Sequence, residues 1–170
     1  MSLRGIFLVD DKPIAHLDIM GVGVFPAFSG NKMYRNRAGC TAILNNGPLP
    51  DGQYWIVDRP TGGIRSWAWA ADIWNTALGS PTDRKEWFAL YRDDGMIDDY
   101  TWVGEVQRGN FRLHPVGGEG VSYGCITLTN HADFQAIRLA LLNTKTIPAG
   151  NSGLLAYGTI EVIARGKTCP

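Results

Sequence analysis

The stretch FRLHPVGGEGVSYGCITL, residues 111–128, decides how this chain folds and where its chemistry lies. Its two ends, residues 110–114 and 122–127, are predicted as short strands, and a glycine-rich connection joins them. The stretch also places His114 shortly before a Ser-x-Gly-Cys turn that ends at Cys125. A thiol nucleophile and its base require these parts, so the stretch indicates a catalytic site.

The predicted nucleophile is Cys125 and the predicted general base is His114. An imidazole near the thiol is expected to favour the thiolate near neutral pH. Gly124 lacks a Cβ, so the backbone can turn sharply and direct N–H groups near Tyr123, Gly124 and Cys125 at a developing oxyanion. The alternative is structural: a buried apolar thiol, a hydrogen-bonded histidine and a hairpin whose glycines need no chemistry to explain them.

These residues resemble the signature of L,D-transpeptidases, the cysteine enzymes that remodel peptidoglycan stem peptides, in which a histidine precedes [Ser/Thr]-x-Gly-Cys-[apolar]. Other segments resemble the branch that includes type VI secretion L,D-transpeptidase effectors. The resemblance spans about residues 20–165. Its segments are Phe28-Ser29-Gly30, 47–54, 57–59, Gly62-Gly63, 87–92 and 108–115.

The resemblance implies an enzyme that transfers acyl groups on stem peptides. Cys125 would attack the bond between diaminopimelate and a terminal D-alanine, and water or an amine would resolve the thioester. It also implies an antibacterial effector whose partners are peptidoglycan muropeptides, a cognate immunity protein and a component of the secretion apparatus. The chain departs from many L,D-transpeptidases in having Tyr123 in place of a second histidine and a shorter spacing from His114 to Cys125. These departures leave the donor and acceptor preference open.

Arg112 precedes His114 by two residues, so both side chains are expected on one face of a strand. A guanidinium there fits a carboxylate of the stem peptide, or else a structural ion pair with Glu119 or an aspartate. Asp58 and Arg59 are expected to form another wall of the cleft, with Gly62-Gly63. The residues predicted to bind substrate are Arg112, Ser122, Asp58 and Arg59.

The bulk composition favours one turn-rich β domain over residues 1–170, because 21 glycines and 9 prolines separate short apolar runs. The predicted fold is mainly β with two short helices, an L,D-transpeptidase-like β-sandwich or open barrel. The helices are predicted over 66–78 and over 130–143, the second with Asn130 as N-cap. Further strands are predicted over 6–9, 14–20, 23–28, 53–57, 87–91, 101–106 and 154–164.

Charge and hydropathy exclude several classes of protein. The chain carries 16 basic and 16 acidic residues, so nothing attracts it to nucleic acid or to anionic membranes. It lacks the roughly 18 to 20 consecutive apolar residues of a membrane span. The apolar run at 6–9 is too short for a signal peptide, so we expect a protein made in the cytoplasm without an ordinary export signal. The resemblance to type VI effectors implies that it is secreted and acts in the periplasm of a target cell.

No cofactor and no metal are expected. Cys40 and Cys169 either pair in an oxidising compartment or stay as free thiols. The acidic run over 93–99 invites a calcium interpretation, but a solvated turn is favoured because glycine stands where a calcium loop needs its glutamate. His16 and His131 are expected at the surface, although the helix that follows Asn130 leaves His131 as a possible assistant to Cys125.

Two other functions remain open at this point. A cysteine peptidase or amidase acting on another peptidoglycan bond would use the same two residues. A non-catalytic wall-binding β domain would use its six tryptophans and six tyrosines as stacking platforms.

Overall fold

The computed structural model describes residues 1–60, 84–117 and 122–170. The predicted helix over 66–78, Gly62-Gly63 and Glu119 lie outside these residues. None of the helices in the described ranges is long and apolar enough to cross a membrane.

Most of the ordered elements are strands. They are β1 (Leu3–Val9), β2 (Ala15–Ile19), β3 (Gly23–Phe28), β4 (Gly52–Asp58), β5 (Phe88–Arg92), β6 (Tyr100–Val103), β7 (Val106–Gly109), β8 (Arg112–Pro115), β9 (Ile126–Leu128), β10 (Ile147–Pro148) and β11 (Leu155–Ala164). The helices are α2 (His131–Leu142) and the single-turn 3-10 helices η1 (Lys32–Tyr34), η2 (Ala38–Cys40) and η3 (Arg84–Glu86).

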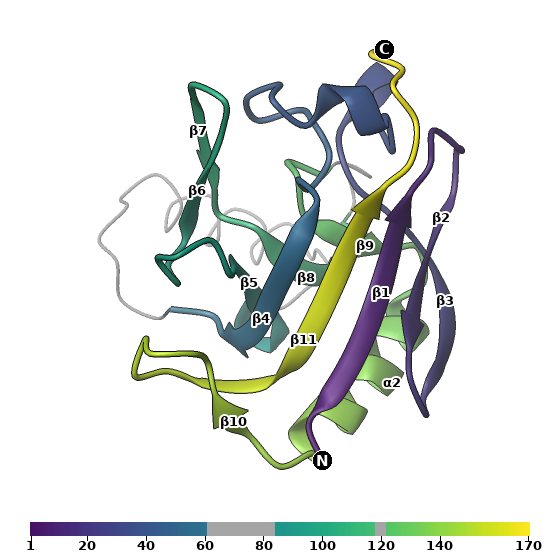
Figure 1. Ribbon diagram of the computed structural model, residues 1–170. Helices are drawn as coiled ribbons and strands as arrows, with labels where there is room; N and C mark the ends of the chain where they lie inside the picture. Colours follow the sequence, from purple (N-terminus) through teal and green to yellow (C-terminus); the bar gives the residue numbers. More distant parts are fainter. Residues whose placement is uncertain (61–83, 118–121) are drawn as a thin grey trace.

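The main sheet closes on itself. Its strands run in the order β1-β2-β3-β9-β8-β5-β4-β11-β10, and β1 also pairs with β11. The pairs β1–β11 and β8–β9 are parallel, whereas the other pairs of this sheet are antiparallel. The predicted mainly β barrel is therefore confirmed, and closure removes the exposed edges that an open sheet would carry. Figure 1 shows β4, β11 and β1 side by side, with the chain termini at opposite ends of the barrel.

Alternation along the strands builds the core. In β2, for example, Ala15, Leu17 and Ile19 are buried while the residues between them, His16 and Asp18, are exposed. The inward residues of the other barrel strands join the same cluster, among them Phe7, Leu90, Leu113 and Ile126. Leu113 and Ile126 therefore fix which face of β8 and β9 turns away from the core.

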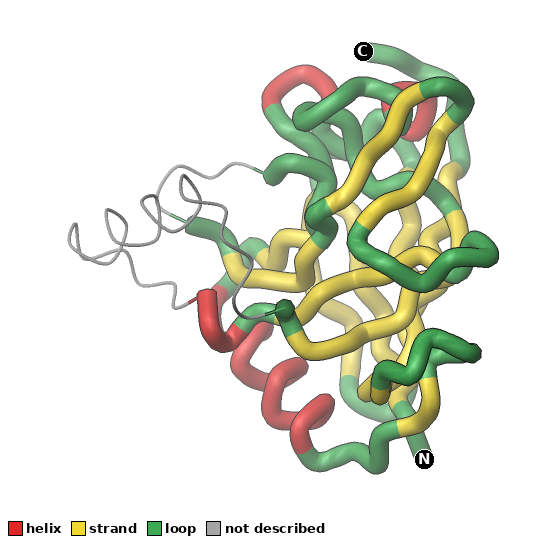
Figure 2. Tube along the Cα trace, turned by 90° about the vertical axis from the view of Figure 1, so that its left-hand side faces the viewer, coloured by secondary structure: helices red, strands yellow, loops and turns green. Residues whose placement is uncertain are grey.

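Helix α2 begins and packs as predicted from its sequence. The Asn130 side chain accepts a hydrogen bond from the backbone N–H of Ala132, which caps the first turn. Phe134, Ile137 and Leu141 lie on one helical face and belong to the barrel core. Figure 2 shows α2 at the end of the barrel nearest the N-terminus.

Two of the predicted strands were wrong in extent. The single strand predicted over 101–106 is divided by a turn at Gly104, where φ is +59°, into the antiparallel ribbon β6–β7. The strand predicted from Ser122 starts only at Ile126, because residues 123–125 form a bend. Both errors arise because turn residues were counted within an apolar run. In Figure 1 the β6–β7 ribbon stands out from the barrel.

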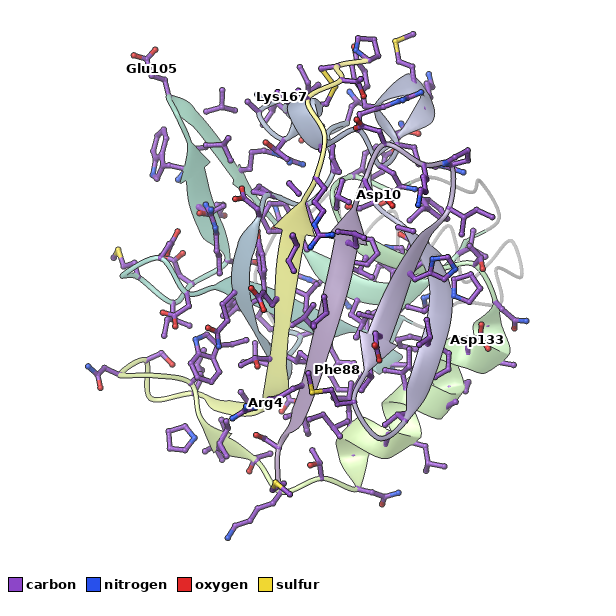
Figure 3. The ribbon with its side chains drawn as sticks, turned by 45° about the vertical axis from the view of Figure 1, so that its right-hand side comes forward. Arg4, Asp10, Phe88, Glu105, Asp133 and Lys167 are labelled. Atoms are coloured by element: carbon purple, nitrogen blue, oxygen red, sulfur yellow. A yellow bond between two sulfur atoms is a disulfide. The ribbon has the colours of Figure 1, made fainter. Side chains whose placement is uncertain are left out.

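The structure settles the pairing of two cysteines. Cys40 and Cys169 form a disulfide with a Cα–Cα distance of 5.0 Å and a sequence separation of 129 residues. The Gly39 N–H donates to the Thr168 carbonyl at 3.1 Å, so backbone contacts support the same junction. Figure 3 shows this disulfide close to Lys167 in the C-terminal segment. The C-terminal tail is thereby fixed to η2 at one end of the barrel.

Loss of the disulfide should destabilise the fold. We expect Cys169→Ala to lower the free energy of unfolding by roughly 2–4 kcal/mol, because the cross-link removes conformational entropy from a long loop of the unfolded chain. Cys169 is exposed, so the substitution removes little packing. Urea unfolding of the oxidised wild type, the reduced wild type and the variant measures the effect. Equal stability of the oxidised and reduced wild type would contradict this expectation.

Candidate active site

The parallel pair β8–β9 places the two predicted catalytic residues on neighbouring segments, His114 on β8 and Cys125 just before β9. Leu113 pairs with Ile126, and His114 pairs with Thr127. Extending this register by one residue toward the N-terminus places Cys125 opposite Arg112. Because Leu113 and Ile126 face the core, the alternating residues Arg112, His114 and Cys125 share the other face. β8 and β9 lie next to each other in Figure 1.

His114 is held in a defined orientation. Its ring is 6% exposed and stacks on Trp87, with the ring centroids 4.3 Å apart. Nδ1 lies 2.7 Å from the Pro115 carbonyl oxygen, and Nε2 lies 3.4 Å from Thr127 Oγ1. Because a carbonyl can only accept, Nδ1 carries a proton, and in the neutral ring Nε2 is then the basic nitrogen.

Cys125 is a buried free thiol on the bend before β9. It is 7% exposed, and its Sγ lies 3.8 Å from the Asn110 carbonyl oxygen, to which it donates. Burial raises the pKa of the thiol to about 11, and the Arg112 backbone N–H and the charges of Arg112 and Arg108 only partly oppose this. This direction opposes the thiolate expected near neutral pH, which stays a prediction. Desolvation outweighs the neighbouring positive charges.

The turn before Cys125 depends on residues of the signature. Gly124 has φ +92°, a left-handed conformation that L side chains rarely adopt. Ser122 is buried, and its Oγ donates to the Cys125 carbonyl at 3.0 Å, which closes the turn. Tyr123 is 55% exposed. The structure thus places Ser122 in the turn, and its contact with substrate stays a prediction.

Arg112 forms an ion pair with an aspartate from another segment. Its Nη1 and Nη2 donate to the two carboxylate oxygens of Asp99 at 2.7 and 2.8 Å, and Nη1 also donates to the Phe111 carbonyl at 2.8 Å. Burial alone would lower the pKa of Arg112, but the hydrogen bonds and charge of Asp99 outweigh it and raise the pKa. The aspartate alternative for Arg112 is therefore realised, and recognition of a substrate carboxylate stays a prediction.

Comparison with known protein families matches residues 23–150 to the Tlde1 domain, a type VI L,D-transpeptidase effector family. The match covers well over half of the 170 residues. This chain belongs to the Tlde1 domain family. No curated protein and no solved structure matches the chain. The matched residues include all eight that were singled out for catalysis and substrate binding, because these lie between Asp58 and Cys125.

Asp58 and Arg59 lie near Trp87 in this Tlde1 domain. They line a cavity of about 290 Å³ together with Lys85, Glu86, Trp87, Phe88, Arg138 and Leu142. Asp58 accepts a hydrogen bond from the Tyr157 hydroxyl at 2.6 Å. Since Trp87 also stacks on His114, this cavity adjoins the proposed base. Substrate binding by Asp58 and Arg59 stays a prediction.

A larger cavity of about 770 Å³ lies elsewhere on the Tlde1 domain. Its lining includes Arg4, Gln53, Trp55 and Glu161 from β1, β4 and β11, and none of the eight predicted site residues. Arg4 is labelled on this outer face in Figure 3. The larger cavity therefore does not coincide with the predicted catalytic residues Cys125 and His114.

The tertiary structure adds site residues that the sequence did not reveal. Asp99 comes from the acidic run, whose other carboxylates cap turns: Asp94 Oδ2 accepts from the Thr101 hydroxyl at 2.5 Å, and Asp98 from the Tyr100 N–H at 2.9 Å. Among the described residues there is no acidic, histidine or cysteine group that could hold a metal ion. Trp87, Thr127 and Arg108 were also missed, since they contact the site only through folding. His131 is exposed at the start of α2.

Gly124→Ala should strongly reduce turnover while leaving the barrel folded. A Cβ at this position would lie 2.4 Å from Arg108 Nη2 and 3.1 Å from Phe111 Cε1, so the turn or the guanidinium must move. Displacing the nucleophile or the oxyanion donors by about 1 Å is expected to cost on the order of 100-fold in rate.

Gly95→Ala provides a matched control, because Gly95 has φ +93° but nothing lies within 4 Å of an added Cβ. Both variants carry similar backbone strain, and only Gly124→Ala creates the clash. Steady-state kinetics of both variants on muropeptides would reveal the difference. If both lost activity equally, the contact with Arg108 would not be the cause.

Proposed function

We propose that this Tlde1 domain catalyses cysteine-dependent acyl transfer on peptidoglycan stem peptides, as an L,D-carboxypeptidase or L,D-transpeptidase. The observation that supports this most is the shared face of β8 and β9. It carries a buried free thiol, Cys125, and a histidine whose tautomer leaves Nε2 basic. Membership of a type VI L,D-transpeptidase effector family points to the same chemistry.

The first half-reaction begins with a protonated thiol. His114 Nε2 accepts the thiol proton as Sγ of Cys125 attacks the carbonyl carbon of diaminopimelate in the bond to D-alanine. Backbone N–H groups of the turn at Tyr123, Gly124 and Cys125 stabilise the tetrahedral oxyanion. The C–N bond then breaks, His114 returns the proton to the departing amine, and a thioester remains on Cys125.

The second half-reaction resolves the thioester. His114 removes a proton from water or from an acceptor amine, which attacks the same carbonyl carbon, and the proton returns to the Cys125 sulfur as it departs. Water gives a tripeptide from a tetrapeptide stem, whereas an amine gives a cross-link or an exchanged D-amino acid. Pro115 supports both halves because its carbonyl holds Nδ1–H and so keeps Nε2 directed to the proton.

Mass spectrometry of defined muropeptides tests this proposal. We expect a disaccharide tetrapeptide to lose D-alanine in water, and to exchange it when a D-amino acid is supplied. Cleavage between the sugar and the peptide, or at another peptide bond, would instead identify an amidase or a different peptidase. Binding without any product would favour the wall-binding alternative.

A further inference from the structure

Two arginines from different strands flank Cys125, and they differ in how their charge is balanced. Arg112 on β8 is paired to both carboxylate oxygens of Asp99, so the pair together carries little net charge. Arg108 on β7 is the second arginine. Its guanidinium is not explained by the mechanism derived so far.

Arg108 is buried without an anionic partner among the described residues. It is 3% exposed, and its hydrogen bonds go to three backbone carbonyls, those of Thr41 at 2.8 Å, Gly47 at 2.8 Å and Pro48 at 2.5 Å. The ring of Phe111 lies 5.2 Å from its guanidinium carbon. These partners are neutral, and burying a charge without a counter-charge is costly. Burial lowers the pKa of Arg108 to about 10, so it remains charged at neutral pH.

The guanidinium of Arg108 lies directly behind the turn that carries the nucleophile. Its Nη2 occupies the space that a side chain at Gly124 would need, only 2.4 Å from the position of an added Cβ. Among the described residues, the charged groups that act on the thiol are Arg112, Arg108 and Asp99. His114 shares its face of the sheet, and the nearby Tyr54 hydroxyl is neutral because burial raises its pKa. Once Arg112 and Asp99 cancel, one positive charge remains.

We propose that Arg108 is the counter-charge for the anion that forms on Cys125 during catalysis. Arg108 offsets the negative charge of the thiolate, while the proton that leaves the sulfur is held by His114. Proton transfer from the thiol to His114 places the negative charge on the sulfur, where Arg108 balances it, and attack then moves this charge onto the carbonyl oxygen of the substrate. Arg108 acts through Cys125 and the turn, so it is a positioning residue. The inference rests on Cys125 as the nucleophile of the proposed function, but its test requires no peptidoglycan.

The test measures how the alkylation rate of Cys125 by iodoacetamide depends on pH. In the oxidised protein Cys40 and Cys169 are bonded, so Cys125 is the free thiol that reacts. The midpoint of this profile is the pH at which the rate reaches half of its maximum. We expect Arg108→Met to raise the midpoint by about one pH unit, which slows alkylation about tenfold at pH values below it. Arg108→Lys keeps the charge and is expected to retain most of the wild-type midpoint.

Asp99→Asn is the matched variant of opposite sign. It leaves Arg112 uncompensated, so we expect the midpoint to fall and alkylation to become about threefold faster below it. A merely structural role of these residues would not move the midpoint in opposite directions. An unchanged midpoint in a folded Arg108→Met protein, or a midpoint that rises in Asp99→Asn, would overturn the proposal. If Arg108→Met does not fold, Arg108→Gln, which also removes the charge, takes its place, and an unchanged midpoint in that variant would overturn the proposal.

The result is separable from the proposed function. If the midpoints shift in opposite directions but no muropeptide is turned over, Arg108 is the counter-charge and the L,D-transpeptidase activity is rejected. If muropeptides are turned over but the midpoints do not shift, the activity stands and the role of Arg108 is rejected.

Discussion

Cys125→Ala is expected to abolish turnover of muropeptides, with a rate loss on the order of 10⁴-fold or more. The thioester cannot form without the sulfur, and no other free cysteine exists in the described part of the chain to replace it. The substitution removes one small buried atom, so the barrel should remain folded. Kinetics on a defined tetrapeptide and intact-mass detection of the thioester measure both halves of the prediction. Full activity in this variant would show that Cys125 is not the nucleophile.

The histidine gives the matched comparison. His114→Ala should cost several orders of magnitude, because the protonated thiol, with a pKa of about 11, depends on a base to become a nucleophile. Nucleophile and base act as one unit, so the double variant should be no slower than Cys125→Ala alone. A double variant much slower than either single one would show that the two residues act independently.

Directing the protein to the periplasm of a Gram-negative cell should stop growth, whereas the 170-residue chain expressed in the cytoplasm should be tolerated. The proposed substrate lies outside the cytoplasmic membrane, so only the exported protein can reach it. The Cys40–Cys169 disulfide suits the same compartment, because disulfides form and persist in the oxidising periplasm. Growth curves and microscopy of cells that express the chain behind an added secretory signal measure the effect.

Cys125→Ala behind the same signal is the control, and we expect it to be harmless at equal periplasmic levels. If this inactive variant also stopped growth, the toxicity would come from export stress or from binding to the cell wall, and not from catalysis. Equal arrest by the cytoplasmic chain, or no arrest with export verified by fractionation, would remove the antibacterial function and leave a wall enzyme or a binding domain.

The sequence predicted most of the barrel, because strand alternation and turn residues are local signals. The hairpin near the N-terminus, the long C-terminal strand and the cap of α2 at Asn130 follow from neighbouring residues. The β6–β7 turn at Gly104 was missed, since a single glycine inside an apolar run does not distinguish a turn from a strand.

The sequence by itself indicated the family and predicted the catalytic pair, because His114 and Cys125 lie in one short stretch whose residue types point to the family together. Only the tertiary structure decided what surrounds them. The parallel pairing of β8 with β9 chooses the face on which both side chains lie. Asp99 and Arg108 reach the site from other segments of the chain. The effect of their charges on the thiol depends on distance and burial, which spacing along the chain does not encode. The pKa of the thiol is raised for the same reason: desolvation is a property of the packed molecule, and it outweighs the charges that the sequence places nearby.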